Sequence, residues 1–323
     1  MGDVILTTPL LRAIRRRHRD AHVAVVTKRE YAPLLADNPN VDRVIEYTRD
    51  RPLGELAGEL RAGRFTHHLD LHDSLRSRAL RWLVPGRWTG YPKHRLARTV
   101  LIRAKRDIYP PGTAPVAERY FAAARELDVS PDGEPAEVYL GAGARRRADA
   151  WLSERGLGAD RPLVVVAPMA AHFTKRWPVE SWGTLVGWLT AEGIDVVVVG
   201  GPGDEAATAT VAASGGARAA SAAGAMDLQG TGALAARARV VAAGDTGVMH
   251  LGTAVGTPVV ALFGPTVEAL GFFPYRARAT VLQLPLDCRP CSKMGGPACP
   301  LGHHRCLRNI EPRRVFKAVT RWL

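Results

Sequence analysis

Short apolar runs and amphipathic stretches alternate along this chain of 323 residues. Compact runs of β-branched and aliphatic residues between helical patterns indicate parallel strands that are buried on both faces. Between these runs, apolar residues recur at intervals that are typical of helices. The predicted strands are residues 23–27, 41–45, 67–71, 163–167, 195–199, 240–243 and 259–263, and the predicted helices are residues 8–18, 117–127, 146–154, 179–192 and 247–255.

This alternation predicts an α/β fold with two doubly wound halves. A polar, glycine-rich stretch at residues 154–162 follows a predicted helix and is typical of a domain boundary. We therefore expect an N-terminal domain over residues 1–157 and a C-terminal domain over residues 158–323, whose last helix packs back on the N-terminal domain. Ligands of open parallel sheets bind beyond the carboxyl ends of the strands, so we expect a site there, between the two halves.

Two features depart from this pattern. The chain opens on Gly2 and Asp3 and enters a helix directly, although a doubly wound domain should begin with a strand. The stretch 230–240 also leaves little room for a crossover, because parallel strands usually need a dozen or more connecting residues. Either the start of the complete chain lies upstream, or this chain lacks its first strand and is unstable or inactive. We expect the former, and we expect the crossover to have lost several residues.

Composition narrows the class of protein. A hydrophobic content of 46% suits two buried cores. No apolar run approaches the roughly 20 residues that span a bilayer, and the first charges follow an apolar stretch, which is the reverse of a signal peptide. These features predict a soluble cytoplasmic protein.

The positive charge is concentrated in one segment. The net charge is +13, and residues 74–106 hold many Lys and Arg residues and no acid. Such a segment indicates an anionic partner, namely nucleic acid, phospholipid or a phosphorylated substrate. A GC-rich genome, which favours Arg codons, would produce the same bias, so composition alone does not choose.

Polar residues cluster where the predicted strand 240–243 gives way to a helix. Asp245, Thr246, Gly247 and His250 lie within six residues of one another. Thr246 is a good N-cap, and Gly247 lets a ligand approach the backbone closely. The free N–H groups and the positive end of the helix dipole form an anion site, with His250 one turn along the same face. A capped helix with a buried core histidine is the alternative interpretation.

Two further loops follow predicted strands. Thr174, Lys175 and Arg176 come after strand 163–167, and a lysine there can neutralise a diphosphate. Asp204 or Glu205 comes after strand 195–199, and an acid there can hold ribose hydroxyls. Together the three loops predict a pocket for a nucleoside diphosphate, with neither a Walker-type lysine loop nor a carboxylate pair for a metal. The alternative interpretation of each loop, taken alone, is an ordinary solvated turn.

Five motifs occur in order over nearly the whole chain: "GDVILTTPLLRAIRRR", "LDLHDSLRSRAL…GRWTGY", "TKRWPVESW", "VVVVGGPGDE" and "GDTGVMHLGTAVGTPVVALFGPT". In them the chain resembles glycosyltransferase family 9, the ADP-heptose–lipopolysaccharide heptosyltransferases. The resemblance implies a GT-B fold, in which two Rossmann-like domains face each other across a cleft, with the first N-terminal strand missing here. It implies an inverting transfer, without metal or cofactor, of heptose from ADP-heptose to a glycan acceptor such as the lipopolysaccharide core.

The resemblance also implies roles for individual residues. Asp3 matches the family's catalytic base, and Lys175 matches the lysine that stabilises the departing diphosphate. The donor-binding residues that it implies are Thr174, Glu205, Asp245, Thr246, Gly247 and His250, and the acceptor-binding residues are Ser74, Arg76 and Ser77. No metal ligand is implied. The basic segment is then expected to capture an anionic glycan or glycolipid, with peripheral contact at the inner face of the cytoplasmic membrane.

Cysteines occur only late in the chain, at Cys288, Cys291, Cys299 and Cys306. The spacing of the first two is that of a metal knuckle, and His303 and His304 lie nearby. Structural zinc, disulfides and reduced thiols all remain open.

Two other functions compete with the transferase. A nucleotide-sugar epimerase would need additional acids and a pair of histidines in the cleft. A nucleic-acid-binding protein would explain the charge, but it would leave the strand-end loops unexplained and lacks aromatic stacking platforms. The expected partners are therefore a nucleotide-sugar donor and an anionic acceptor, without nucleic acid.

Overall fold

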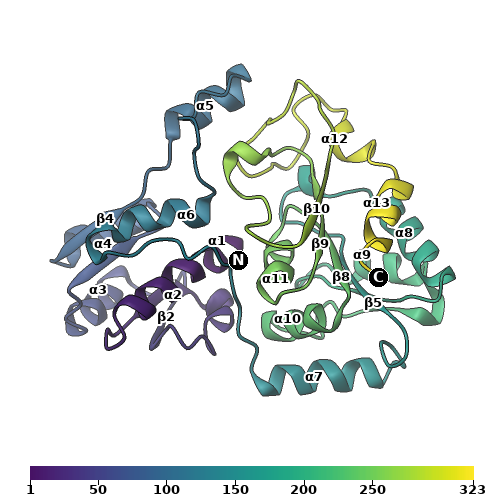
Figure 1. Cartoon of the computed structure of the whole chain (residues 1–323), viewed down its shortest axis with the longest axis horizontal. Helices are drawn as coiled ribbons and strands as arrows, with labels where there is room; N and C mark the ends of the chain where they lie inside the picture. The colour runs from purple at the N-terminus through teal and green to yellow at the C-terminus, as the bar shows by residue number, and fades with distance from the viewer.

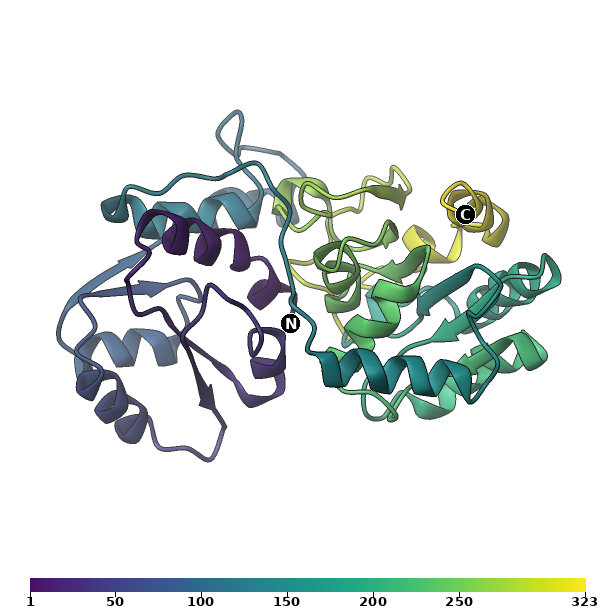
Figure 2. The same cartoon turned by 60° about the horizontal axis from the view of Figure 1, so that its bottom comes forward.

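A computed structural model describes residues 1–323 as two α/β units that lie side by side and are joined by an extended segment (Figure 1). The short helix α1 lies at the junction of the two units in both views (Figures 1 and 2). The first unit contains α1 (Gly2–Ile5), α2 (Thr8–Arg17), β1 (Ala24–Lys28), η1 (Arg29–Leu34), β2 (Arg43–Tyr47), α3 (Leu53–Ala62), β3 (His67–Asp70), α4 (Leu75–Leu83), β4 (Arg87–Gly90), α5 (Arg95–Ala104), α6 (Val116–Arg119) and η2 (Tyr120–Leu127).

The second unit is built on one six-stranded parallel sheet in the order β10-β9-β8-β5-β6-β7. The chain places β6 and β7 on one side of β5 and then returns to place β8, β9 and β10 on the other, so the topological switch point lies between β5 and β8. The elements are α7 (Ala142–Ser153), β5 (Leu163–Ala167), η3 (Phe173–Lys175), α8 (Val179–Ala191), β6 (Asp195–Val198), α9 (Glu205–Ala213), η4 (Gly216–Arg218), β7 (Ala219–Ser221), α10 (Leu228–Arg237), β8 (Val240–Gly244), α11 (Gly247–Ala254), β9 (Val259–Phe263), η5 (Glu268–Leu270), β10 (Ala279–Gln283), α12 (Arg305–Arg308) and α13 (Pro312–Thr320).

The four central strands of this sheet are buried at every position, as valine-rich strands between two helical layers should be. One face packs against α8, α9 and α13, and the other against α7, α10 and α11. These sequence-predicted strands are confirmed to within one residue at their ends. The rigid sheet holds the loops at its carboxyl edge in fixed positions.

Two expectations about the domains need correction. Trp151 and Leu152 of α7 pack into the core beneath β5 and α10, so the change from one core to the other comes before α7 and not at residue 157. The last helix, α13, packs on α8 and β9 through Val315 and Val319 and does not return to the first unit. In both helices the apolar face is buried by the second sheet.

The crossover before β8 is also longer than expected. It runs from residue 222 to residue 239 and contains the ten-residue helix α10. The sequence interpretation missed β7, a three-residue strand, and therefore counted the crossover from the wrong point. Asp227 caps α10 by accepting a hydrogen bond from the Gly230 amide at 2.7 Å. No loss of residues needs to be invoked.

The first unit contains two separate parallel pairs, β1-β2 and β3-β4, in place of one sheet. Both pairs contribute to two hydrophobic clusters. One cluster includes residues of α2 and η2, and the other includes residues of α3 and α4. The two pairs therefore share both clusters, although no strand of one pair is hydrogen-bonded to a strand of the other. In β1, Val26 is 40% exposed, whereas the central strands of the second unit are buried throughout.

The two units are held together around α1. Ile5, Leu34 and Leu251 belong to one small apolar cluster that joins the first unit to α11. Arg119 adds a hydrogen bond to the Leu270 carbonyl at 2.9 Å. None of the helices has the length and apolar character needed to cross a bilayer.

Candidate active site

Lys175 and Asp245 meet at the switch point of the second sheet. Lys175 ends η3 in the loop after β5, and Asp245 follows β8 directly. Their Nζ and Oδ2 atoms lie 2.6 Å apart, and both side chains are largely buried. Thr266, in the loop after β9, donates a hydrogen bond to the same Oδ2 at 2.6 Å. Three strand-end loops are thus tied together at one carboxylate.

Glycine at position 244 makes this approach possible. A Cβ there would lie 2.9 Å from the Lys175 carbonyl oxygen, closer than side chains tolerate. Behind the loops, Arg289 donates to the carbonyl of Gly264 at 2.5 Å and to that of Thr266 at 2.7 Å. Arg289 therefore fixes the loop from which Thr266 reaches Asp245.

The amino end of α11 carries two buried polar atoms without partners. Thr246 is the N-cap residue, as predicted, but its side chain makes no capping bond, which differs from the expectation. Its Oγ1 and the Nδ1 of His250 are both buried and unbonded within the protein. Leaving such groups unpaired costs stability, so they are suited to bind a ligand. The first N–H groups of the helix face the same end.

His250 is neutral in this position. Burial lowers its pKa to about 4, and the negative charges of Asp245 and Asp3 only partly oppose that effect. The positive charge of Lys175 adds to the lowering. At neutral pH the imidazole therefore acts as a hydrogen-bonding group and carries no charge of its own.

Asp3 lies on the first-unit side of this cluster. Its neighbour Gly2 is pressed against His250, because a Cβ at Gly2 would lie 2.7 Å from Cδ2 of the imidazole. Burial and the negative charge of Asp3 raise the pKa of Tyr120 well above its ordinary value, and that of Tyr91 to about 12. The Asp3 side chain is exposed to solvent. The structure therefore brings Asp3 beside the donor loop predicted from sequence.

At Gly247 the predicted close approach is made by the chain itself. A Cβ at this position would lie 2.6 Å from the Met1 sulfur. The backbone at the start of α11 thus faces the first unit across a narrow contact. The need for glycine at this position is explained by that contact.

Thr174 has a different environment from the one expected of a ligand-binding residue. It is buried, its Oγ1 accepts from the Gly296 amide at 2.8 Å, and its carbonyl oxygen lies 3.0 Å from Nε2 of His304. These bonds tie the Lys175 loop to the cysteine-containing segment. In the structure Thr174 positions its neighbour Lys175.

Glu205 begins α9 beyond the end of β6, one strand farther from the switch point than Lys175. It is exposed, and hydrogen bonds from the amides of Glu205 and Gly203 lower its pKa. The adjacent Asp204 accepts from the Gly201 amide at 2.9 Å, so its carboxylate is used in the turn. Both carboxylates thus accept backbone hydrogen bonds, and Glu205 is the more exposed of the two.

The three acceptor-side residues lie at the start of α4. Ser74 is the N-cap, and the side chains of Ser74 and Ser77 form a reciprocal capping box. Arg76 places its guanidinium 4.3 Å from the ring centroid of Tyr47 in β2. Helix capping therefore accounts for both serines. Arg76 forms no ion pair, so its charge is available to an anionic acceptor.

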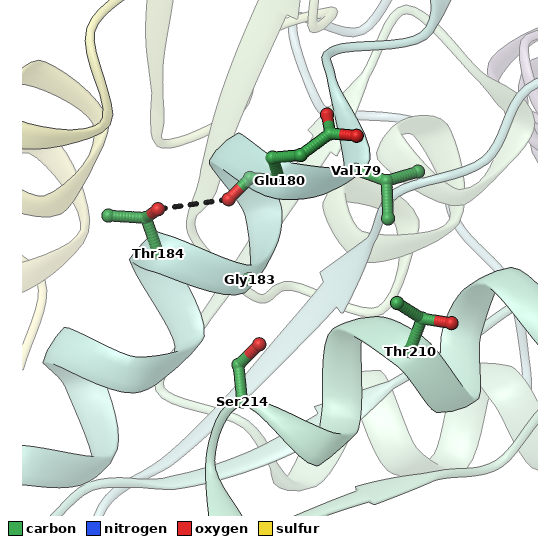
Figure 3. Close-up of a pocket in the computed structure, with 6 residues that line it drawn as sticks. All are labelled: Val179, Glu180, Gly183, Thr184, Thr210 and Ser214. Carbon is green, nitrogen blue, oxygen red and sulfur yellow. Dashed lines mark hydrogen bonds between the residues drawn. The ribbon is translucent and has the colours of Figure 1, made fainter.

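The surface also has a hollow between α8 and α9, lined by Val179, Glu180, Gly183, Thr184, Thr210 and Ser214 (Figure 3). Its hydroxyls have local uses, since Thr184 donates to the Glu180 carbonyl at 2.9 Å. None of the residues at the switch point lines it. The polar residues at the switch point therefore indicate the candidate site better than this hollow does.

The four cysteines are free thiols, and Cys306 is buried. Burial raises the pKa of Cys306 to about 11, and the nearby thiol Cys291 adds to that effect. No three Cys, His, Asp or Glu side chains of the chain are placed as a metal site. The segment serves here as packing around the Thr174 loop.

Comparison with known proteins assigns the chain to a family. The chain matches the description "Glycosyltransferase family 9 (heptosyltransferase)" over residues 53–301. The chain belongs to this family. It is a glycosyltransferase, and membership in family 9 favours the transferase over the epimerase and the nucleic-acid-binding protein.

Relatives of family 9 match over the full length. The chain is 26% identical to lipooligosaccharide heptosyltransferase 2 of Haemophilus influenzae, covering 100% of this chain and 96% of the relative. It is 26% identical to lipopolysaccharide heptosyltransferase 2 of Escherichia coli, covering 99% and 94%. Among solved structures, a family 9 glycosyltransferase of Veillonella parvula aligns with a TM-score of 0.82 at 26% identity, covering 100% and 94%. The ADP-heptose heptosyltransferase II of E. coli aligns with a TM-score of 0.76 at 24% identity, covering 99% and 95%, and confirms the GT-B fold.

Several residues of this candidate site escaped sequence reasoning. Thr266 lies in the quoted motif "FGPT", yet its link to Asp245 depends on the order of β8 and β9. Arg289 lies in a loop that the cysteines alone had drawn attention to. Tyr91 and Tyr120 surround Asp3 from distant parts of the first unit. Only the tertiary fold brings these residues to the site.

Proposed function

We propose that the chain transfers heptose from ADP-heptose to an anionic glycan acceptor such as the lipopolysaccharide core. The names of the full-length relatives support this donor and acceptor class. The switch-point cluster supports a nucleoside diphosphate at the site, because it gathers a buried cation, unpaired polar atoms and a helix amino end.

In this proposal the diphosphate of the donor lies between Lys175 and the start of α11. Lys175 turns from Asp245 toward the phosphate oxygens and offsets the charge that develops as ADP leaves. Thr246 Oγ1 donates to a phosphate oxygen, and neutral His250 bonds the sugar or the bridging oxygen. Asp245 holds Lys175 in place before the donor binds, and Glu205 holds the ribose hydroxyls.

Asp3 acts as the base. Its carboxylate takes the proton of an acceptor hydroxyl while that oxygen forms a bond to the anomeric carbon. The bond from the anomeric carbon to the diphosphate oxygen breaks at the same time, so the configuration inverts. The proton ends on Asp3 and the electron pair on ADP. No metal or cofactor takes part in this sequence.

The acceptor approaches along the first unit. Arg76 and the basic segment 74–106 provide the positive charge that an acceptor carrying phosphates or carboxylates would require. An acceptor of this kind is a membrane glycolipid, so the enzyme works at the inner face of the cytoplasmic membrane as a peripheral protein.

The single observation that supports this function most strongly is the meeting of Lys175 and Asp245 beside the unbonded Thr246 hydroxyl. The test is a panel of ADP-, UDP- and GDP-sugars with lipopolysaccharide core acceptors, measured as release of nucleoside diphosphate. We expect acceptor-dependent release from ADP-heptose and little from the others. Equal release from UDP-hexoses would contradict the proposed donor.

A further inference from the structure

One face of α4 exposes large apolar side chains to solvent. Leu75 is 86% exposed and Trp82 is 91% exposed. They are seven residues apart, which is about two helical turns, so they lie on the same side of the helix. Leu80, on the opposite side, is buried in the core of the first unit. The outer side of α4 thus has an apolar stripe that the fold does not require.

A second helix, tied to the loop before α4 by the ion pair of Arg95 with Asp73, also exposes apolar side chains. In α5, Ala97 and Leu101 face inward, while Leu96 is 74% exposed. Ile108, shortly after the helix, is 47% exposed. Figure 1 shows α5 at the end of two long connections, standing away from the strands of the first unit. Lys105 connects it to the second unit through a hydrogen bond of 2.6 Å to the Pro290 carbonyl.

Positive charge surrounds these apolar groups. Arg78 pairs with Asp73 at 2.9 Å, and Arg81 pairs with Asp70 at 2.9 Å. Four other arginines of the segment have no acidic partner: Arg76, Arg98, Arg103 and Arg106. Arg78 and Arg81 also line a shallow hollow beside Trp82. The hollow also includes Asp73, so the cations beside Trp82 are paired, and the net positive charge of the segment comes from the four unpaired arginines.

We propose that α4 and α5 form a docking face for an anionic lipid bilayer, with Trp82, Leu75 and Leu96 at the boundary of headgroups and acyl chains. Tryptophan and leucine beside arginine suit that boundary, where an apolar body and a charged rim are both satisfied. A second copy of this chain would bring the same positive charge against itself, which opposes association through this face. The unpaired arginines attract acidic headgroups, and their effect falls with salt.

This inference rests on the proposed function only in that a membrane glycolipid is the acceptor. A docked α4 would keep Arg76 at the membrane surface, because Arg76 lies in the first turn of the same helix. The acceptor's polar head would then meet the enzyme without leaving the bilayer. The docking face is distinct from the donor site, since no residue of the switch-point cluster belongs to it.

The test is co-sedimentation of the full chain with vesicles of phosphatidylcholine alone or with about 30% phosphatidylglycerol, an anionic lipid. We expect binding to the anionic vesicles only, weakened by 0.5 M salt. Trp82→Ala with Leu75→Ala should reduce partitioning at least about tenfold. Trp188→Ala, on the second unit where Trp188 is 41% exposed, is the matched control and should bind as the unchanged chain does.

Charge is tested separately with Arg103→Glu and Arg106→Glu, against Arg313→Glu on α13 as control. Equal binding to both vesicle types, or equal binding by the Trp82 variant and the Trp188 variant, would overturn the proposal. Binding only when lipopolysaccharide core lipid is present would also overturn it, and would assign the face to the acceptor. Thermal unfolding and ADP binding should be unchanged in every variant. The vesicle-binding result can therefore be interpreted even if the proposed transferase activity is not found.

Discussion

Lys175 and Asp245 form an ion pair of 2.6 Å across the switch point of the second sheet. The pair joins the loop after β5 to the loop after β8, which are neighbours only because the chain reverses its winding direction between them. Breaking a buried pair by removing one partner is costly, because the other charge is left uncompensated. The pair therefore holds the lysine in place before any donor arrives.

Removal of Lys175 should weaken diphosphate binding. We expect Lys175→Ala to raise the Kd for ADP about 10- to 100-fold, since it removes the buried cation at the site. Isothermal titration calorimetry with ADP measures this directly. Lys317→Ala on α13 serves as the control and should leave the Kd unchanged. If Lys175→Ala binds ADP as tightly as the control does, Lys175 is not in the pocket.

The coupling of the pair can be measured through stability. Lys175→Ala should lower the free energy of unfolding by about 3 kcal/mol, because it leaves the buried carboxylate of Asp245 without a compensating charge. Adding Asp245→Asn should recover much of that loss, as removing both charges costs less than removing one. Additive losses in urea unfolding of the single and double variants would argue against a direct pair.

The neutral, buried His250 predicts a pH-dependent stability. Its pKa of about 4 lies below the ordinary value of 6.5, so the unfolded chain binds this proton more readily than the folded one. This contribution to stability is complete above pH 6.5 and is lost as the pH falls toward 4. Between pH 7 and pH 5 the loss should be about 2 kcal/mol. The charged groups that face the imidazole are Asp245, Asp3, Lys175 and the amino group of Met1.

Urea unfolding of the unchanged chain and of His250→Gln at pH 7 and pH 5 checks this. The variant should lose less stability on acidification, and the difference isolates the histidine from the surface carboxylates common to both. Equal losses in the two proteins would show that folding does not lower the pKa of His250.

The unbonded hydroxyl of Thr246 gives a prediction that separates binding from folding. Thr246→Val keeps the shape but removes the hydroxyl, so ADP affinity should fall about tenfold while the melting temperature stays the same or rises. Thr253→Val in the same helix is the contrasting variant. Its hydroxyl donates to the His250 carbonyl at 2.8 Å, so it should lower the melting temperature. A destabilised Thr246→Val with normal ADP affinity would assign Thr246 a structural role.

Sequence patterns predicted the second unit better than the first. The central strands β5, β8 and β9 are uninterrupted apolar runs, since helices cover both faces, and such runs are easy to locate. In the first unit, β4 has the sequence RWTG, with exposed ends and a half-buried middle, so no apolar run marks it. The strand β7, AAS, is too short and too small to be recognised.

The site shows a similar division. Lys175 and Asp245 were predicted because they lie in loops that follow strands, and strand ends of one sheet share an edge. His250 was predicted because it lies one turn into the helix that follows Asp245. Bonds within the protein were not predictable from the pattern. Thr174 and Ser74 have the right residue type for binding, yet their hydroxyls are taken by neighbours that depend on the fold.

The division of the first unit into two unconnected strand pairs predicts that it can accept one more strand. The amino group of Met1 lies near Lys28, at the end of β1, so a strand placed ahead of Met1 would run parallel to β1. An engineered extension of about eight residues rich in Val and Ile should raise the melting temperature by at least about 3 °C. Amides of β1 and β3 should become protected from hydrogen exchange.

A Gly- and Ser-rich extension of the same length is the control for that experiment. It should change neither the melting temperature nor the exchange. If both extensions act alike, or if protection appears only outside β1 and β3, the layer has no open strand position.

Asp3 should be required for turnover but not for donor binding. Asp3→Asn preserves the shape while removing the basic carboxylate, so kcat should fall about 10²- to 10⁴-fold. The Kd for the donor should stay within about twofold. Glu30→Gln, an exposed acid that faces Lys28 close to the chain start, is the matched control and should keep its activity. Full activity in Asp3→Asn would exclude it as the base.

The most direct measurement is a crystal structure of the chain soaked with ADP. The proposed site places the diphosphate between Lys175 Nζ and the first amides of α11, within hydrogen-bonding distance of Thr246 Oγ1, and with Asp3 facing it from the first unit. A diphosphate bound at any other edge of the sheet, with the Lys175–Asp245 pair untouched, would contradict the account.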